Sequence, residues 1–238
     1  MNKFETDFDY FINLIKSNTN FSFSRYGDGE HMIMSGEPVG YNTQAHQVDK
    51  WNYDGRVTEV SKKLIETFNH TESNYWYGIP TQIENLKCYE YFTNLIKNDK
   101  VTFANLWINA NYKKMYNFYK TTDKSIYLIC NQKAKKENFP FQVNEIFPFP
   151  DDCISYWENY GDDYISQLVN YIIHITNQTF FISCGPISEI IIHNLYNVNP
   201  NNQYIDLGSS IDEFIHGYKT RPYMNPNSNY ANSKSNFL

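Results

Sequence analysis

The chain has 238 residues, a formal net charge of −6 and a pI of about 5.5. It contains no basic run that would give a broad nucleic-acid-binding surface, and no apolar stretch of the roughly 18 residues that a membrane span requires. Its four cysteines show no C-x-x-C spacing. That argues against a zinc site or a redox pair and favours a reducing, cytoplasmic compartment.

Helical and extended patterns alternate along the chain. Apolar residues at Phe8, Phe11, Ile12 and Ile15 predict an amphipathic N-terminal helix. Short apolar segments predict strands at 21–25, 75–79, 101–107, 125–130, 144–147, 179–184 and 204–207. Helical spacing predicts helices at 30–35, 57–68, 83–96, 110–119, 155–175 and 187–196, the longest of which is expected to divide near Gly161. Turn residues without a period predict a loop over 36–54.

Several of the predicted strands are uninterrupted apolar runs, such as SIYLIC at 125–130 and TFFISC at 179–184. Such runs are typical of parallel strands that are covered on both faces. We therefore predict an α/β fold with an open, mostly parallel, Rossmann-like sheet and helices on both faces. A single domain is expected over residues 1–223, followed by a polar, frayed tail over 224–238.

Ligands of open α/β sheets bind beyond the carboxyl ends of the strands, which here are segments 25–30, 105–111, 184–186 and 206–212. In the first of them, Asp28 and Glu30 flank a glycine, and their carboxylates can converge on one point if Gly27 and Gly29 let the backbone curl. Mg²⁺ and Mn²⁺ take one or two such protein ligands and complete their shell with water and substrate phosphate. By spacing alone, an exposed polar turn is the stronger interpretation.

The string SRYGDGE at 24–30 resembles the R-[FY]-G-D-G-E signature of the GT-D type glycosyltransferases, a family first described as a bacterial domain of unknown function. ISCGP at 182–186 and YIDLG at 204–208 resemble two later segments of that family, and the likeness spans about 21–223. The resemblance implies a hexosyl- or pentosyltransferase in which Asp28 and Glu30 bind Mn²⁺ or Mg²⁺. This metal would hold the diphosphate of a nucleotide sugar, with a UDP-sugar as the favoured donor.

The chain departs from the family after the last strand, where Ser209 stands in place of a frequent histidine. Ser209 remains a candidate for donor binding, but a role of that histidine does not transfer to it. If the sugar is transferred with inversion, a base must take the proton of the acceptor hydroxyl. Asp212 is the chosen candidate, although an Asp in front of a short helix is commonly an N-cap. Asp206, inside the strand, is the second candidate and could instead orient its neighbours.

Four further residues are candidates for binding the donor. Arg25 could reach a phosphate or form a structural salt bridge. Gly185 permits close backbone approach at a strand-to-helix turn, where the N-terminus of the helix would face an anion, or is simply a tight turn. Arg221 carries a guanidinium suited to phosphate, and Asn109 could bind sugar hydroxyls.

Tyr41 and Trp51 lie in the predicted loop, where they could stack on a base or sugar or pack against the core. The expected acceptor is a hydroxyl of a glycan, glycoprotein or glycolipid, with no nucleic acid as partner. Two other functions fit the same residues. A metal-dependent phosphoester or nucleotide hydrolase would use Asp28 and Glu30 with water as acceptor, and a non-catalytic module would only bind a nucleotide sugar.

Overall fold

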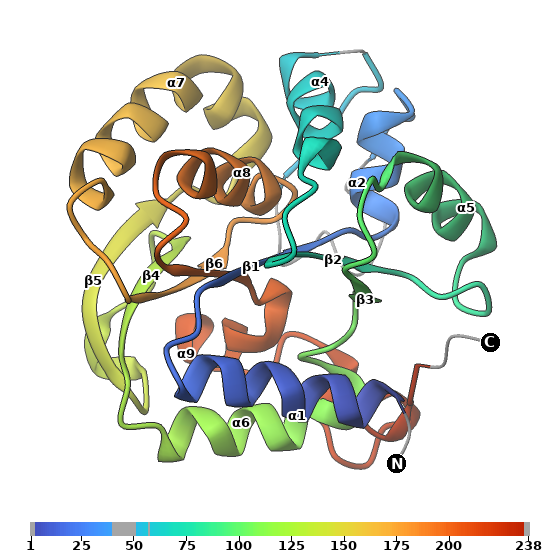
Figure 1. Ribbon diagram of the computed structural model, residues 1–238. Coiled ribbons are helices and arrows are strands. Elements are labelled where there is room, and N and C mark those ends of the chain that lie inside the picture. Colours follow the sequence, from blue (N-terminus) through green and yellow to red (C-terminus); the bar gives the residue numbers. More distant parts are fainter. Residues whose placement is uncertain (1–2, 40–50, 57, 236–238) are drawn as a thin grey trace.

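A computed structural model describes residues 3–39, 51–56 and 58–235, and these form an α/β fold around one sheet (Figure 1). Within the described residues the sheet has seven strands in the order β3-β2-β1-β7-β6-β4-β5, and every ladder between them is parallel. The predicted α/β class is therefore confirmed. The strands are β1 (Phe21–Arg25), β2 (Tyr75–Ile79), β3 (Val101–Phe103), β4 (Ser125–Asn131), β5 (Gln142–Phe149), β6 (Thr179–Ser183) and β7 (Gln203–Asp206).

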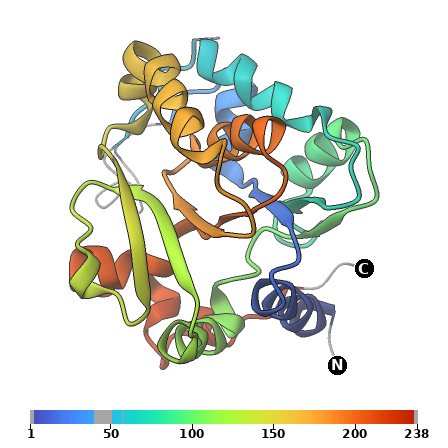
Figure 2. The same ribbon diagram turned by 60° about the vertical axis from the view of Figure 1, so that its left-hand side comes forward.

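Helices cover both faces of this sheet (Figures 1 and 2). The layer drawn above the sheet in Figure 1, here called the upper layer, contains α2 (Asp28–Met34), α4 (Glu59–Glu66), α5 (Leu86–Leu95), α7 (Cys153–Ile172) and α8 (Ser188–Val198). The lower layer contains α1 (Lys3–Lys16), α6 (Tyr112–Thr121) and α9 (Asp212–His216). Short 3₁₀ turns are η1 (Thr67–Asn69), η2 (Asn109–Asn111), η3 (Lys136–Asn138), η4 (Gly208–Ile211), η5 (Pro222–Met224) and η6 (Asn229–Asn232).

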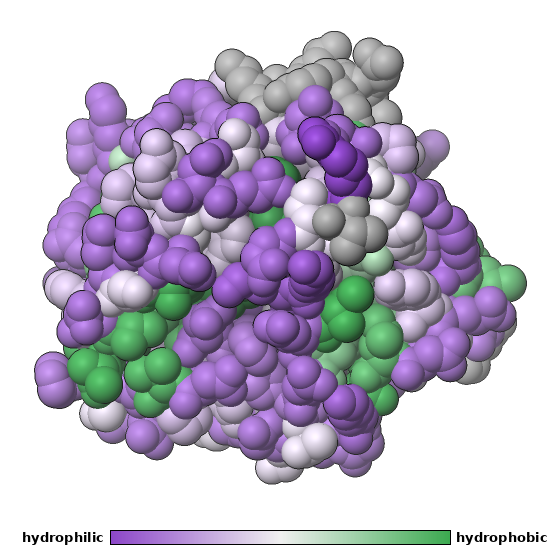
Figure 3. Space-filling view, turned by 90° about the horizontal axis from the view of Figure 1, so that it is seen from above, coloured by the Kyte–Doolittle hydropathy of each residue, from purple (hydrophilic) through white to green (hydrophobic). Residues whose placement is uncertain are grey.

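Each layer buries its own apolar cluster against the sheet. The upper cluster includes Phe92, Trp157 and Leu195, and the lower one includes Phe11, Phe118 and Ile215. Viewed from above, the surface is mostly hydrophilic, with separate apolar patches (Figure 3). The helices of the upper layer thus turn one side to the sheet and another to water, which is the arrangement that their amphipathic spacing predicts.

The crossovers place a topological switch point between β1 and β7. Where the next strand in the sequence lies nearer the β3 edge of the sheet, the connection to it runs through the upper layer. Where the next strand lies nearer the β5 edge, the connection, through α6 or through 132–141, packs in the lower cluster. All of them therefore have the same hand, as parallel crossovers require. After β1 the chain enters α2 above the sheet, but after β7 it enters η4 and α9 below it. Where neighbouring strands diverge in this way, open α/β sheets have their ligand crevice.

The predicted division of segment 155–175 into two helices is wrong, because α7 runs unbroken through Gly161. A Cβ built on Gly161 would lie 2.7 Å from Cδ2 of Trp157, so the glycine makes room for a buried indole one turn earlier. The predicted strand 101–107 is also too long, since β3 ends at Phe103 and a turn follows. The predicted loop 36–54 lies partly outside the described residues.

The described part of the predicted tail, residues 224–235, is packed rather than frayed. The Ala110 amide donates to the Ser233 carbonyl at 3.0 Å, and Lys234 pairs with Glu5 at 3.1 Å. Ser235 also donates a hydrogen bond to Glu84. These contacts join the tail to the beginning of α1 and to the turn before α6. In the part of the chain that the structure describes, no helix is long and apolar enough to cross a membrane.

Replacing Gly161 by alanine tests the packing of α7. Alanine would add about 1 kcal/mol of helix propensity, but overpacking against a buried ring typically destabilises by about 1–3 kcal/mol. We expect the clash with Trp157 to prevail and the free energy of unfolding in urea to fall by about 1–2 kcal/mol. Gln167→Ala, at an exposed position of the same helix, is the control and should change it by less than about 0.5 kcal/mol.

Candidate functional site

The RYGDGE segment forms the end of β1 and the first turn of α2. The Tyr26 amide donates to the Gly78 carbonyl at 2.8 Å, and its buried hydroxyl hydrogen-bonds Thr67 at 2.6 Å. Gly27 is the N-cap of α2, and its amide donates to Oε2 of Glu30 at 2.6 Å. This bond satisfies one of the helix's otherwise unpaired N-terminal amides. The local sequence thus ends a strand, anchors a tyrosine in the core and begins a helix within three residues.

Asp28 and Glu30 differ in exposure and in their hydrogen-bond partners. They are the first and third residues of α2, and positions two apart on a helix do not face each other. Asp28 is exposed and accepts from the Gly29 amide at 3.0 Å, whereas Glu30 is 8% exposed. No group of three or more His, Cys, Asp or Glu side chains in the described residues could hold a metal ion.

This arrangement limits the kind of metal site that the two carboxylates can form. It does not fit a site built from three or more protein ligands. It does fit a hard cation that takes one or two carboxylates and completes its shell with water and a diphosphate. Asp28 is the accessible ligand in such a site, because Glu30 is already engaged by the Gly27 amide.

A buried cluster of charged groups lies directly behind this turn. Arg25, at the end of β1, pairs with Asp206, at the end of the adjacent β7, with 3.4 Å between Nε and Oδ2. Burial lowers the pKa of Arg25, but the nearby carboxyls of Asp206, Glu30 and Glu189 outweigh it, so that the pKa is higher than usual. The guanidinium is therefore permanently charged. Its side chain remains 24% exposed, so it is not sealed from a ligand.

The three carboxyls of this cluster compete for one guanidinium. Burial raises the pKa of Glu30 and of Asp206, and Arg25 opposes the rise in both cases. Burial together with the charges of Asp206 and Glu30 raises the pKa of Glu189 well above its usual value. Glu189 is only 1% exposed and interacts with Asp206. We infer that Glu189 is the carboxyl that keeps its proton and shares it with Asp206, since two unscreened buried carboxylates cannot both ionise.

Sequence reasoning missed Glu189. It is the second residue of α8 and comes four residues after Gly185, in the first helical turn, where an acid is commonplace. The signal that could have found it is the combination of a strand, a Gly-Pro turn and an acid pointing back toward the carboxyl edge. Only the neighbouring position of β1 and β7 shows that this acid meets Arg25.

The turn after β7 is shaped around Arg25. Gly208 has φ of +51°, and a Cβ built on it would lie 2.6 Å from Nη2 of Arg25. The amide of Gly208 donates to Oδ1 of Asp206 at 2.7 Å, and its carbonyl accepts from Ser183 at 2.8 Å. A side chain at position 208 would displace the guanidinium, so glycine is required by both conformation and space.

Asp212 and its neighbours form a second polar group beyond this turn. Asp212 is the first residue of α9, is 6% exposed and accepts from the Thr220 hydroxyl at 2.8 Å. Nε of Arg221 lies 3.9 Å from its Oδ2. Ser209 hydrogen-bonds the Tyr223 hydroxyl at 2.8 Å. Four of the predicted site residues, Asp206, Ser209, Asp212 and Arg221, are thus brought to one edge of the sheet.

Gly185 and Gly29 face each other across Trp51. A Cβ on Gly185 would lie 3.4 Å from Nε1 of Trp51, and one on Gly29 would lie 3.4 Å from Cη2 of the same indole. Trp51 is 7% exposed, so its ring fills the space between the first turn of α2 and the turn after β6. Tyr41, the other predicted stacking residue, lies outside the described residues.

Asn109 is the predicted donor-binding residue that the structure places apart from Arg25. It follows β3, at the edge of the sheet, and β2 separates that strand from β1. Its 3₁₀ turn packs against the C-terminal turns η5 and η6 instead. Its φ of +54° is a conformation that asparagine tolerates better than most residues, which accounts for an asparagine at this turn.

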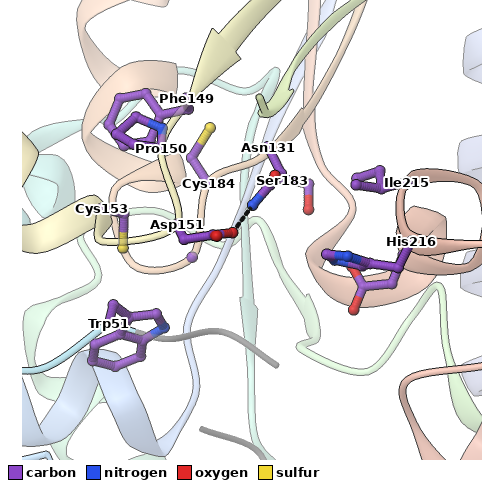
Figure 4. A pocket seen from close by; sticks show the side chains of 12 residues that line it. Trp51, Asn131, Phe149, Pro150, Asp151, Cys153, Ser183, Cys184, Ile215 and His216 are labelled. Atoms are coloured by element: carbon purple, nitrogen blue, oxygen red, sulfur yellow. Dashed lines mark hydrogen bonds between the residues drawn. The ribbon is translucent and has the colours of Figure 1, made fainter. Parts of the chain in front are cut away.

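A small cavity opens on the other side of Trp51, toward β4 and β6 (Figure 4). It encloses about 60 Å³. Asn131 and Asp151, which are hydrogen-bonded to each other, line it together with Ser183, and His216 faces them from α9. Asp212 and Gly185 also belong to its wall, so the cavity connects the two groups of predicted residues.

The fold is similar to two solved structures of the domain of unknown function 1792, one of which is described as having a distinct glycosyltransferase fold. The TM-scores are 0.55 and 0.54 at 15% sequence identity, and each comparison covers 87% of this chain and 79% of the other. No family model and no curated protein matches this chain. At this identity the likeness shows the fold alone.

Glu189→Gln tests the proton in the buried cluster. Because the pKa of Glu189 is raised in the folded protein, its contribution to stability is complete below the unfolded pKa of about 4.3 and is lost as the pH rises through the folded value. The glutamine variant cannot lose this proton. Relative to the variant, the wild type should lose up to about 1.4 kcal/mol of unfolding free energy for each pH unit above about 4.3.

Urea unfolding of both proteins between pH 5 and pH 8 measures this difference. Asp163→Asn, which removes an exposed acid from α7, is the matched control. Its unfolding free energy should change with pH in the same way as that of the wild type. A constant difference between wild type and Glu189→Gln across this range would show that Glu189 is ionised in the folded protein.

Proposed function

We propose that this protein is a metal-dependent glycosyltransferase that moves a sugar from a nucleotide-diphosphate sugar to an acceptor hydroxyl. The observation that carries the proposal is the Arg25–Asp206 pair at the switch point, beside the RYGDGE turn. The glycosyltransferase fold of the structural neighbours supports it. The favoured donor is a UDP-sugar, and the acceptor is a hydroxyl of a glycan, glycoprotein or glycolipid.

The diphosphate of the donor would lie at the carboxyl ends of β1 and β7. Arg25 offers a guanidinium that stays charged and is held in place by Asp206 and by the backbone of Gly208. A planar guanidinium with a fixed orientation suits the oxygens of a phosphate. Preorganisation of this kind stabilises charge that grows on a leaving group, because no reorganisation is needed during the reaction.

Asp28, with Glu30 beside it, would hold a Mn²⁺ or Mg²⁺ ion. Bound there with the donor diphosphate, the metal would supply Lewis-acid stabilisation of the departing nucleoside diphosphate. Glu30 has a second role in this protein, since it caps the helix that carries Asp28 and so fixes where Asp28 stands. Arg221 is a further group with the charge to contact the donor, next to Asp212.

The two acids predicted as bases are better suited to positioning. Asp206 is 1% exposed and paired with Arg25, and Asp212 accepts from Thr220 beside Arg221. A carboxylate that is buried and already engaged by its neighbours lies out of hydrogen-bond reach of an acceptor hydroxyl, which a general base must contact. We assign Asp206 the role of holding Arg25, and Asp212 that of holding the segment that carries Thr220 and Arg221.

Asp28→Asn tests the metal site. We expect Mn²⁺-stimulated release of nucleoside diphosphate from UDP-glucose or a related UDP-, GDP- or dTDP-sugar to fall at least about 100-fold, since one charged ligand is lost. Mn²⁺-stimulated release should also fall in Glu30→Gln, although the amide oxygen of the glutamine can still accept from the Gly27 amide and keep the helix capped. Glu90→Gln, an exposed acid on α5, is the control.

Three results would contradict this assignment. Full transferase activity in Asp28→Asn would remove the metal from the mechanism. Release of nucleoside monophosphate without an acceptor would show a hydrolase instead. Binding of nucleotide sugar that is never turned over, and that Asp28→Asn leaves unchanged, would show a binding module.

Arg25→Lys tests the phosphate contact without removing the charge. Loss of the charge altogether would leave buried carboxyls unpaired, which typically destabilises by about 3–5 kcal/mol. Lysine keeps the charge but lacks the planar fork, so the KM for the donor should rise about 10-fold or more while the protein stays folded. Donor titrations followed by nucleoside diphosphate release, with thermal unfolding as a check on folding, measure this. An unchanged KM would place the diphosphate elsewhere.

A further inference from the structure

The cavity beyond Trp51 lies next to the proposed donor site but is separate from it. The indole of Trp51 stands between Gly29 of the metal motif and Gly185, and the cavity lies on the Gly185 side. Its walls come from the ends of β4, β5 and β6 and from α9, and of these strands β6 lies next to β7 in the sheet. A group bound here would therefore meet the donor from the side opposite to Asp28.

The size and lining of the cavity indicate a hydroxyl group as its occupant. A volume of about 60 Å³ holds a few water molecules or the hydroxyl-bearing end of a larger molecule, but not a nucleotide sugar. Asn131, Asp151 and Ser183 supply amide, carboxylate and hydroxyl groups, and Phe149 and Ile215 supply apolar wall. Mixed donors and acceptors with an apolar wall match a sugar carbon and its hydroxyl.

His216 is the group in this wall that can take a proton near neutral pH. It lies one helical turn after Asp212 on α9, and both residues line the cavity. Asp212 already accepts from Thr220 and stands near Arg221, which stabilises its ionised form. A neutral imidazole, in contrast, gains a proton readily in this pH range. The cavity thus contains an imidazole one helical turn from Asp212, the residue that the sequence predicts as the base.

We propose that this cavity is the acceptor subsite and that His216 is the catalytic base that deprotonates the acceptor hydroxyl. The inference rests on the proposed glycosyltransferase function and deepens it. The hydroxyl of the acceptor enters the cavity between His216 and the Asn131–Asp151 pair. The anomeric carbon of the donor lies between this cavity and Arg25, and Trp51 forms a wall beside it.

The step is a direct displacement. The acceptor oxygen forms a bond to the anomeric carbon while the bond from that carbon to the diphosphate oxygen breaks. The hydroxyl proton passes to the imidazole of His216, and the nucleoside diphosphate leaves with the electron pair. The anomeric configuration inverts, and the proton on His216 is later released to water.

Charged and titratable groups face His216 from several elements. Asp212 lies on its own helix, and Asp151 follows β5 on the far wall. Cys153 at the start of α7 and Cys184 at the end of β6 contribute buried thiols. Burial raises the pKa of Cys184 well above its usual value, so that thiol stays neutral. The charged groups around His216 are thus two carboxylates, each of which also lies beside a cation: Asp151 pairs with Lys133, and Asp212 lies near Arg221.

Water and azide as acceptors test this base without knowledge of the natural acceptor. Attack by water needs a base, whereas azide is already an anion and carries no proton to remove. In His216→Ala we expect release of nucleoside diphosphate with water to fall about 10²–10⁴-fold, the usual contribution of a general base. Added sodium azide should restore release in the variant, with formation of the glycosyl azide, and have little effect on the wild type.

The pH profile and donor binding separate a base from a merely structural residue. The acidic limb of the wild-type rate, where imidazole becomes protonated, should be absent in His216→Ala and in the second variant His216→Gln. The Kd of UDP with Mn²⁺ should stay within about twofold in both variants, because His216 contacts the acceptor and not the donor. His174→Ala, at an exposed position after α7, is the control and should retain both rate and profile.

Each outcome decides one of the two proposals. Equal rates and an unchanged acidic limb in wild type and His216 variants would overturn the role of His216. Lost activity that azide does not restore, with UDP binding weakened, would make His216 a structural residue. If the wild type binds nucleotide sugars but releases no nucleoside diphosphate under any condition, the glycosyltransferase function itself fails.

Discussion

The rest of this site depends on one interaction, the pairing of the Arg25 guanidinium with the carboxyls buried at the junction of β1 and β7, here called the seam. Arg25 and Asp206 end neighbouring parallel strands, so the sheet itself brings their charges together. Glu30 and Glu189 come from the first turns of α2 and α8 and add two further carboxyls to the same buried space. Buried charges are stable only when they are paired. The seam therefore constrains where both helices begin, and burial in it raises the pKa of all three carboxyls.

The turns around this seam are selected by the space that the guanidinium needs. Gly208 adopts a left-handed conformation and lies against Arg25, where a Cβ would overlap it. Its amide and its carbonyl both bond to neighbouring side chains, so the loop that leads to α9 is fixed at its first residue. The result is a charged group held rigidly at the point where the chain diverges to opposite faces of the sheet. Such a group can bind an anion without first having to be ordered.

The carboxyl edge is divided into two compartments with different chemistry. On the β1 side are the exposed Asp28 and the partly exposed Arg25, and groups of these two kinds suit a cation together with a diphosphate. On the β4 and β6 side, His216 and the Asn131–Asp151 pair line a small cavity that suits a hydroxyl. Trp51 stands between them. The proposed group transfer would use both compartments, with the leaving group stabilised on one side and the acceptor deprotonated on the other.

The sequence by itself determined the order of the elements, the parallel sheet and the turn by which the chain passes from Arg25, at the end of β1, into α2. These features depend on apolar runs and helical spacing, which are local properties of the chain. Only the tertiary structure decided that Glu189 joins Arg25 and that His216 faces the cavity, because both follow from which distant strands become neighbours. It also decided that Asp28 is exposed while Glu30 is buried, since the turn continues as a helix and Glu30 caps it. Spacing in the sequence specifies which residues are close along the chain, whereas the pairing of β1 with β7 specifies which charges must be neutralised together.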